Sequence, residues 1–162
     1  MAVFARGVGN ELRFQNNRDG VNDARIGGPA SPTSANPRFM IQRVAKIPLA
    51  ALDTGGGVLS WQNDEGGSIV ITRVVLDVTT KATGACTVDV GTTASSATTS
   101  SDNLIDGLDV GTATGLFSNL KNPGTNGKAD QKLASGKWVT ASMASGAAAG
   151  TVGYAYIHYH LV

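Results

Sequence analysis

Residues 68–80 read SIVITRVVLDVTT, the longest unbroken strand-type run in the chain. β-branched residues dominate this run, and such residues favour a pleated, half-buried surface. The even positions form one nearly pure apolar face, which consists of Val70, Thr72, Val74, Leu76 and Val78. The odd positions are mixed, because Arg73 and Asp77 alternate there with apolar residues. A period of two with one apolar face predicts a strand that lies on a core, and it argues against a helix.

Shorter strand patterns flank this run on both sides. Residues 58–62 and the Gly-rich turn 63–67 precede it, and together they predict an antiparallel hairpin with it. Residues 86–91 follow it after a short turn. They predict a second hairpin, in which every second side chain from Cys86 onward points inward. The central run is therefore expected to pair with both of its neighbours in the chain.

The C-terminal part contains two further clear strands. Residues 137–143 and 151–162 flank a loop of small residues, which predicts a third hairpin. One face of the last strand is expected to hold Tyr154, Tyr156, His158 and His160, and the other Ala155, Ile157, Tyr159 and Leu161. A ladder of tyrosine and histidine is more often a subunit contact or a half-exposed sheet face than a metal site.

The whole pattern is that of an all-β protein. Six to eight short strands follow one another with turn residues between them, and no helical period of useful length occurs. We expect an antiparallel β-sandwich of jelly-roll type, with a closed barrel as the alternative. Residues 1–46 are expected to form an extended N-terminal arm, and residues 47–162 the sandwich body.

The predicted arm differs from the body in charge. Residues 1–46 carry seven basic and three acidic side chains, a net +4, whereas residues 47–162 carry six basic and nine acidic ones, a net −3. Three prolines between residues 27 and 37 argue against a helix or a central strand there. Arginine pairs bidentately with carboxylates, so an acidic protein surface is the expected partner. The cations are loosely spaced and form no RGG clusters, which argues against nucleic acid.

The overall composition favours an assembly subunit. Charged residues make up 15% of the 162 residues, against roughly 25% in ordinary soluble domains, and the net charge is +1. A near-zero net charge promotes association between copies rather than keeping them apart. The 21 glycines suit many short strands joined by loops, and they lack the strict period of a collagen.

The single cysteine and the N-terminus predict where the chain is made. Cys86 alone cannot form an intrachain disulfide or a cysteine-based zinc site, and we expect a buried, inert thiol. The N-terminal residues lack the apolar run of a secretory signal, and no segment reaches the about 20 apolar residues of a membrane span. These features predict a soluble product made in the cytoplasm, with no membrane partner.

Two clusters are candidate metal sites. His158 and His160 stand two residues apart, but they are the only histidines and have no cysteine pair to complete a zinc site. Asp102, Asp106 and Asp109 surround Asn103 in a pattern that does not match an EF-hand loop. Acidic residues that cap local backbone are the commoner explanation. We therefore expect neither a metal nor a cofactor.

The sequence also argues against an enzyme. It contains no Gly-x-Ser-x-Gly elbow, and neither histidine lies in a loop beside a nucleophile. The Gly-rich turn at residues 53–57 lacks the Lys-Ser/Thr pair and the following helix of a phosphate loop. No catalytic residue is predicted.

Several segments resemble small structural proteins of tailed bacteriophages. They are residues 101–111 (SDNLIDGLDVG), 124–128 (GTNGK), 137–142 (KWVTAS) and 150–157 (GTVGYAYI). The resemblance covers about residues 58–162 and leaves the arm out. Within that group the chain is most similar to capsid decoration (cement) proteins. The resemblance implies a virion protein on the capsid exterior, made in the host cytoplasm, which forms homotrimers or other small oligomers and clamps neighbouring copies of the major capsid protein. It transfers no functional residue.

The decoration hypothesis assigns a role to the arm, and two other hypotheses remain. Contacts with the capsid or with neighbouring copies are expected at Arg6, Arg13, Phe14, Arg18, Arg25 and Arg38. The first alternative is a head- or tail-fibre domain that recognises host glycans, because jelly rolls often serve as lectins. Sugars would then stack on Trp61, Trp138, Tyr154 and Tyr156. The second alternative is a ring-forming tail-tube or baseplate component.

Overall fold

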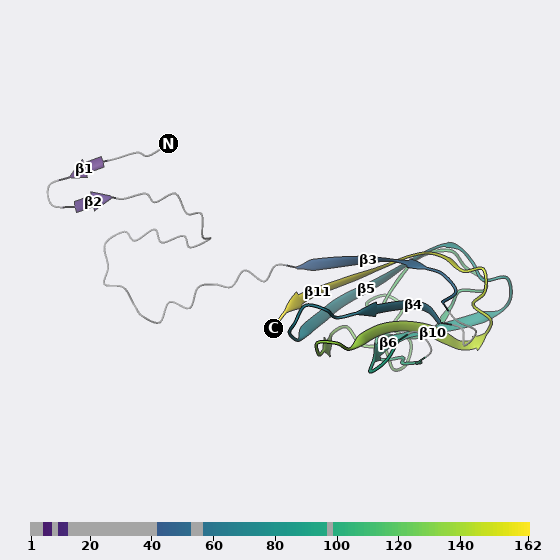
Figure 1. Cartoon of the computed structure of the whole chain (residues 1–162). Helices are drawn as coiled ribbons and strands as arrows, with labels where there is room; N and C mark the ends of the chain where they lie inside the picture. The colour runs from purple at the N-terminus through teal and green to yellow at the C-terminus, as the bar shows by residue number, and fades with distance from the viewer. Residues whose placement is uncertain (1–4, 8–9, 13–41, 53–56, 97–98) are drawn as a thin grey trace. The chain divides into compact units, whose positions relative to one another are not determined.

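The computed structural model of the chain describes residues 5–7, 10–12, 42–52, 57–96 and 99–162 (Figure 1). The chain divides into two units, Met1–Phe39 and Met40–Val162. In the first unit, β1 (Ala5–Gly7) pairs antiparallel with β2 (Asn10–Leu12). The remaining elements described below belong to the second unit, the body.

The body is all-β, with two antiparallel sheets and no helix among the described residues. Its strands are β3 (Arg43–Leu49), β4 (Gly57–Gln62), β5 (Ile69–Thr80), β6 (Cys86–Thr93), β7 (Ile105–Asp109), β8 (Gly115–Ser118), β9 (Gln131–Leu133), β10 (Trp138–Gly146) and β11 (Val152–Leu161). One sheet, called here the β10 sheet, has the order β4-β10-β6-β7. The other, the β11 sheet, has the order β3-β11-β5-β8, with β9 paired to β5. This confirms the predicted all-β class.

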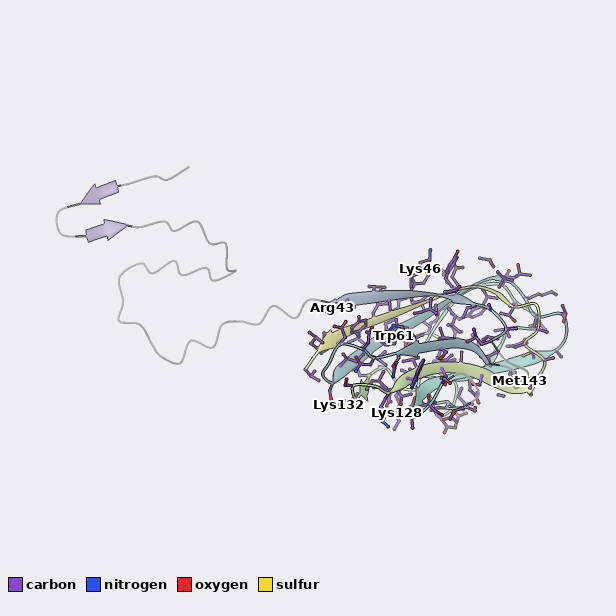
Figure 2. All side chains as sticks on the ribbon, in the orientation of Figure 1. Arg43, Lys46, Trp61, Lys128, Lys132 and Met143 are labelled. Atoms are coloured by element: carbon purple, nitrogen blue, oxygen red, sulfur yellow. The ribbon has the colours of Figure 1, made fainter. Side chains whose placement is uncertain are left out.

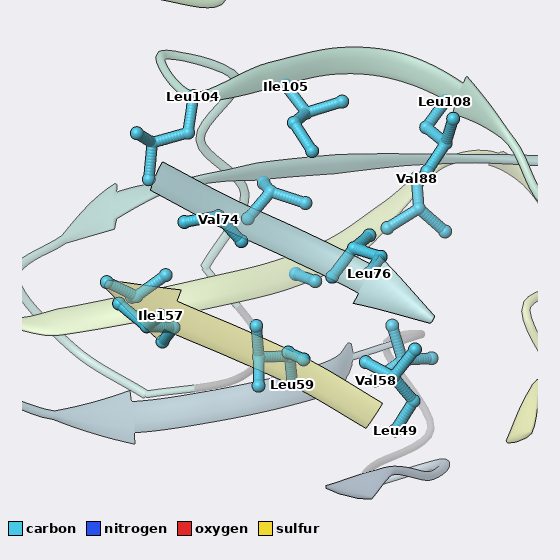
Figure 3. Packing of buried hydrophobic residues seen from close by; sticks show 14 of the residues in the cluster. Leu49, Val58, Leu59, Val74, Leu76, Val88, Leu104, Ile105, Leu108 and Ile157 are labelled. Atoms are coloured by element: carbon cyan, nitrogen blue, oxygen red, sulfur yellow. The ribbon is translucent and has the colours of Figure 1, made fainter. Parts of the chain in front are cut away.

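A single hydrophobic core joins the two sheets. Figure 3 shows Val74 of β5 and Ile157 of β11 in the same cluster as Leu59 of β4. These three side chains are fully buried, and the cluster takes buried residues from almost every strand of the body. Burying apolar area contributes about 25 cal/mol per Å², so this shared layer is the main term that holds the two sheets together.

The three predicted hairpins are wrong. β4 and β5 lie in different sheets, and the same is true of β5 and β6 and of β10 and β11. The turn residues do reverse the chain at the expected places, but each turn carries it across the core rather than to a hydrogen-bonded neighbour. Stacked sheets lie only about 10 Å apart, so a short Gly-rich turn serves either connection equally well. Turn chemistry alone therefore could not assign a strand to a sheet.

The inward face of β5 changes partway along the strand. The predicted face is buried at Val74, Leu76 and Val78, but at the start of the strand Ile69 and Ile71 are buried instead. The cause is a β-bulge, because the register with β11 shifts between His158 and Tyr159 and leaves Thr72 without a partner residue. One extra residue moves all the following side chains to the other face. The expectation that Val70 faces the core is wrong for this reason.

The predicted boundary at residue 46 falls inside a strand. β3 begins at Arg43 and pairs with β11 along its full length, so Arg43 and Lys46 belong to the β11 sheet. Proline at position 48 is tolerated because β3 is an edge strand. The arm predicted for the preceding residues lies outside the described part of the chain, apart from the backbone of β1 and β2.

Candidate interaction surface

The outer face of the β11 sheet carries the predicted ladder of tyrosine and histidine. Along β11, the side chains of Ala155, Ile157 and Tyr159 are buried, whereas those between them are partly or fully accessible. The predicted alternation is thus confirmed for most of the strand. Leu161, which the alternation placed inward, is exposed where the strand ends. The ladder therefore lies on the solvent side of its sheet.

Strand register places further side chains beside this ladder. Residues directly opposite each other on paired strands point to the same side of a sheet. The resulting surface, called here the open face, consists of Val44, Lys46, Pro48, Val70, Arg73, Val75, Asp77, Leu116, Lys132, Tyr154, Tyr156, His158 and His160. Val44, Leu116 and Tyr154 are 52%, 65% and 40% exposed. The open face thus combines exposed apolar and aromatic surface with three cations and one carboxylate.

A cation lies over the aromatic part of the open face. The ammonium of Lys46 is 3.9 Å from the ring centre of Tyr154 and 5.7 Å from that of Tyr156. Figure 2 shows the Lys46 side chain projecting outward from β3. A cation over an aromatic ring is attracted by the ring quadrupole, by about 0.5–1 kcal/mol at an exposed site. This contact ties the edge strand β3 to β11 on the solvent side.

The histidine end of the open face disfavours additional positive charge. His158 stands opposite Arg73 in the register between β11 and β5. Burial lowers the pKa of His158 from its ordinary 6.5, and the neighbouring positive charge of Arg73 lowers it further. The imidazole is therefore neutral at pH 7, and protonating it would place two cations side by side.

The outer face of the β10 sheet is covered instead. Residues 99–101, in the described part of the segment between β6 and β7, lie against it, and the carbonyl oxygen of Thr99 accepts hydrogen bonds from the hydroxyls of Thr140 at 2.9 Å and Ser142 at 3.1 Å. Both of these β10 residues are buried. Gly91 of β6 allows the close approach, because a Cβ atom there would lie 2.4 Å from the Ser101 hydroxyl. Among the described residues, the segment after β6 thus covers the β10 sheet along β10, whereas the outer face of the β11 sheet has no comparable cover.

One end of β3 is anchored across the core by polar contacts. The phenol of Tyr159 donates a hydrogen bond of 2.7 Å to Glu65, and Arg43 forms an ion pair with the other carboxylate oxygen. Hydrogen bonds from Arg43 and Tyr159 hold the pKa of Glu65 below its usual value. Burial and the bond to Glu65 raise the pKa of Tyr159 to about 12. The contact draws together β3, β11 and the turn after β4.

The two tryptophans predicted as sugar platforms are not freely exposed. The Trp61 ring packs on the core, with its centre 5.2 Å from that of Tyr159 (Figure 2 labels Trp61 near Arg43). Trp138 is also partly buried. Of the four predicted stacking residues, Tyr154 is the most open, and Tyr156 lies beside it on the open face.

Sequence reasoning missed a buried asparagine that completes the β11 sheet. Asn119 fills the gap along β5 between β8 and β9, where its side-chain oxygen accepts from the amide of Val74 at 2.8 Å. Its amide group donates to the carbonyls of Lys128 at 3.0 Å and Ala129 at 2.7 Å. Asn119 thus satisfies the backbone on the edge of β5 where neither β8 nor β9 pairs with it. The only sequence signal is one asparagine among several in a polar loop.

The acidic cluster serves local structure. Asp109 accepts hydrogen bonds from the backbone of Gly111 and from Thr112, and the Thr112 hydroxyl is the main cause of its lowered pKa. Asn126 donates to Asp102 through its side chain at 2.8 Å and to Asp106 through its backbone at 3.1 Å. Within the described ranges, no group of three or more histidine, cysteine or acidic side chains is arranged to hold a metal ion.

The cysteine is buried as predicted. Cys86 is a free thiol, 3% exposed, on the inward face of β6. Burial raises its pKa, and the negative charge of Asp109 raises it further. The sulfur therefore stays protonated at neutral pH and is a weak nucleophile.

The comparisons leave the chain without a family. Searches against models of protein families, curated proteins and solved structures found no match. No helix in the parts that the structure describes is long and apolar enough to span a membrane. The predicted contact residues Arg13, Phe14, Arg18, Arg25 and Arg38 lie outside the described residues, and Arg6 is placed only as part of the β1 backbone. The similarity to phage structural proteins stays a prediction.

Proposed function

We propose that this protein is a structural component of a tailed-phage virion, which decorates the outside of the capsid and clamps neighbouring major capsid subunits. The observation that supports this most is the contrast between the two sheets. One outer face is covered along β10 by the protein's own chain, whereas the other presents aromatic, apolar and cationic side chains. A broad, uncovered sheet face of this kind suits contact with another protein better than it suits chemistry on a small substrate.

We infer further that the two sheets form a jelly-roll sandwich. If the eight longer body strands are numbered along the chain without β9, the sheets have the orders 1-8-3-6 and 2-7-4-5. Strand 1 then pairs with 8, 2 with 7, 3 with 6 and 4 with 5, as if one long hairpin had been rolled up. Every one of these pairs is antiparallel. Viral capsid domains and lectins both use jelly rolls, so this topology is compatible with the proposed role and with its alternative.

In this proposal the N-terminal residues supply the capsid contact. Their excess of arginine complements an acidic surface, and many weak contacts add up when copies cover a shell. Deleting residues 1–41 should abolish binding to phage shells that lack this protein, while the body stays folded because β3 begins only at Arg43. Co-sedimentation with the shells measures the binding, and circular dichroism checks the fold.

A matched pair of full-length variants separates charge from chain length. Replacing Arg6, Arg13, Arg18, Arg25 and Arg38 with glutamine should weaken shell binding strongly, whereas replacing them with lysine should weaken it less. If the chain without residues 1–41 covers shells as fully as the intact chain does, the assigned role of these residues is wrong.

The glycan-binding alternative has one supporting observation. Tyr154 exposes its ring on a rigid strand, with Tyr156 beside it. A fibre domain should bind particular glycans on an array, and Tyr154→Ala should abolish the signal. A decoration protein should give no signal with either chain.

A further inference from the structure

Four of the eight acidic side chains that the structure describes in the body lie on β6, on β7 and in the segment between them. Asp89 of β6 accepts a hydrogen bond of 2.8 Å from the backbone of Gly107, next to Asp106. Asp102 and Asp106 are bridged by Asn126. The acidic rim, as it is called here, consists of Asp89, Asp102, Asp106 and Asp109. Lys128 lies on the adjoining loop, where its backbone bonds to Asn103, but the four carboxylates outnumber it.

The open face has the opposite charge. Lys46, Arg73 and Lys132 lie on it with a single carboxylate, that of Asp77. The open face and the acidic rim also belong to different sheets, because the first lies on the β11 sheet and the second on β6, β7 and the adjoining loop. One copy could therefore use both surfaces at the same time, each with a different neighbour.

We propose that the open face of one copy binds the acidic rim of a second copy, head to tail. Charge decides this arrangement. A two-fold contact between two open faces would bring Lys46, Arg73 and Lys132 of both copies together, and like charges across an interface are strongly unfavourable. A head-to-tail contact pairs these cations with carboxylates, while Val44, Tyr154 and Leu116 supply the apolar area.

This arrangement repeats from copy to copy. Because the contact joins two different surfaces, each copy binds one neighbour through its open face and another through its acidic rim. The assembly closes into a ring when the rotation between neighbouring copies allows it. A trimer is one such ring. The inference rests on the assembly role proposed above, because it names the contact that copies make with one another rather than the contact with the capsid.

The test uses the full chain and two charge-reversed variants. The face variant carries Arg73→Glu and Lys132→Glu, and the rim variant carries Asp102→Lys and Asp106→Lys. Sedimentation velocity should show the unmodified chain as an oligomer that dissociates as NaCl rises from about 50 to about 500 mM, since exposed charges are screened over that range. Each variant alone should associate at least about tenfold more weakly.

Charge reversal distinguishes the possible contacts. The two variants mixed together should associate again, because the reversed face of one then meets the reversed rim of the other. The rim variant alone tests the alternative, because a contact between two open faces does not involve the rim. If the rim variant associates as strongly as the unmodified chain, the open face binds another open face, and the head-to-tail arrangement is overturned. A monomeric unmodified chain at low salt overturns it as well.

Two further measurements keep the outcome decisive. If the rim variant does not fold, Asp102→Asn with Asp106→Asn removes the charge but keeps an oxygen to accept from Asn126, and it should still weaken association. Deleting residues 1–41 should leave the oligomer intact. Loss of shell binding by an oligomer that persists supports both proposals. An intact oligomer in a full chain that does not bind shells rejects only the capsid role, and shell binding by a monomer rejects only this inference.

Discussion

The two sheets share one core, but their outer faces are completed in different ways. The β10 sheet presents small polar residues, Thr140 and Ser142, whose hydroxyls bond to the carbonyl of Thr99 in a loop of the same chain. The β11 sheet presents Tyr154, Tyr156 and their neighbours, and its described outer side has no such loop over it. The small hydroxyl side chains leave room for the covering segment and donate hydrogen bonds to it. The larger side chains of the β11 sheet remain available for contact with another molecule.

The largest predicted effect is the difference in unfolding free energy between substitutions on the buried side and on the exposed side of β11. Ile157 and Tyr156 are adjacent on β11, but only Ile157 is fully buried. Ile157→Ala should lower the free energy of unfolding by about 2–5 kcal/mol, because it leaves a cavity in the shared core. Tyr156→Ala should lower it by about 1 kcal/mol or less. Urea unfolding of both variants measures this, and equal losses would contradict the assignment of the two faces.

A smaller effect is expected where the loop covers the β10 sheet. Gly91→Ala places a Cβ atom 2.4 Å from the Ser101 hydroxyl and 2.6 Å from the Ser101 carbonyl oxygen, so the loop must move outward. We expect a loss of about 1–3 kcal/mol in unfolding free energy, with faster hydrogen exchange at residues 99–104. Gly67→Ala is the matched control, because no atom lies within 4 Å of the added methyl group. Unchanged exchange in the Gly91 variant would show that the cover is looser than described.

The smallest effects concern pH, and they distinguish the open face from the anchor of β3. The pKa of His158 is lowered from 6.5, so the unfolded chain takes up the proton first and stability decreases as the pH falls below 6.5. The pKa of Glu65 is lowered from 4.5, so its contribution is complete above that pH and is lost as the pH falls through the lowered value. The melting temperature should therefore decrease in two separate ranges.

Two substitutions assign these ranges. His158→Gln should flatten the decrease below pH 6.5 and leave the lower range unchanged. Glu65→Gln should lower the melting temperature slightly at pH 7, because it removes the ion pair with Arg43, and it should flatten the decrease below pH 4.5. Calorimetric scans between pH 7 and pH 3 measure both effects. Asp109, whose pKa is also lowered from 3.8, contributes to the decrease at lower pH. A Glu65→Gln profile that keeps the full acid decrease would exclude Glu65 as a cause.

Much of the local structure could be predicted from the sequence. The predictions that were wrong concern features that depend on contacts between segments far apart in the chain. Alternation correctly placed Cys86 inside and Tyr154 outside. It failed at Ile71, because the bulge at Thr72 depends on how β5 pairs with β11, which lies about 80 residues further along the chain. It also failed for the hairpins, because a short turn fits either a neighbouring strand or a strand across the core.

The candidate surface was predictable only in part. The sequence indicated the ladder on the last strand, and it placed Lys46 in an arm rather than beside Tyr154. Strand pairing brought Lys46, Arg73 and Lys132 to one face from three separate segments. No local pattern marks such residues, because each belongs to a different strand.

By itself, the sequence determined that this chain forms strands, and along most of them which side chains are buried, because alternation within a strand is a local property of the extended backbone. The tertiary structure decided which strands pair, where β5 changes face and which sheet keeps an uncovered surface. Those features depend on contacts between segments far apart in the chain. Their stability comes from the packed core and from hydrogen bonds that exist only after the whole body has folded.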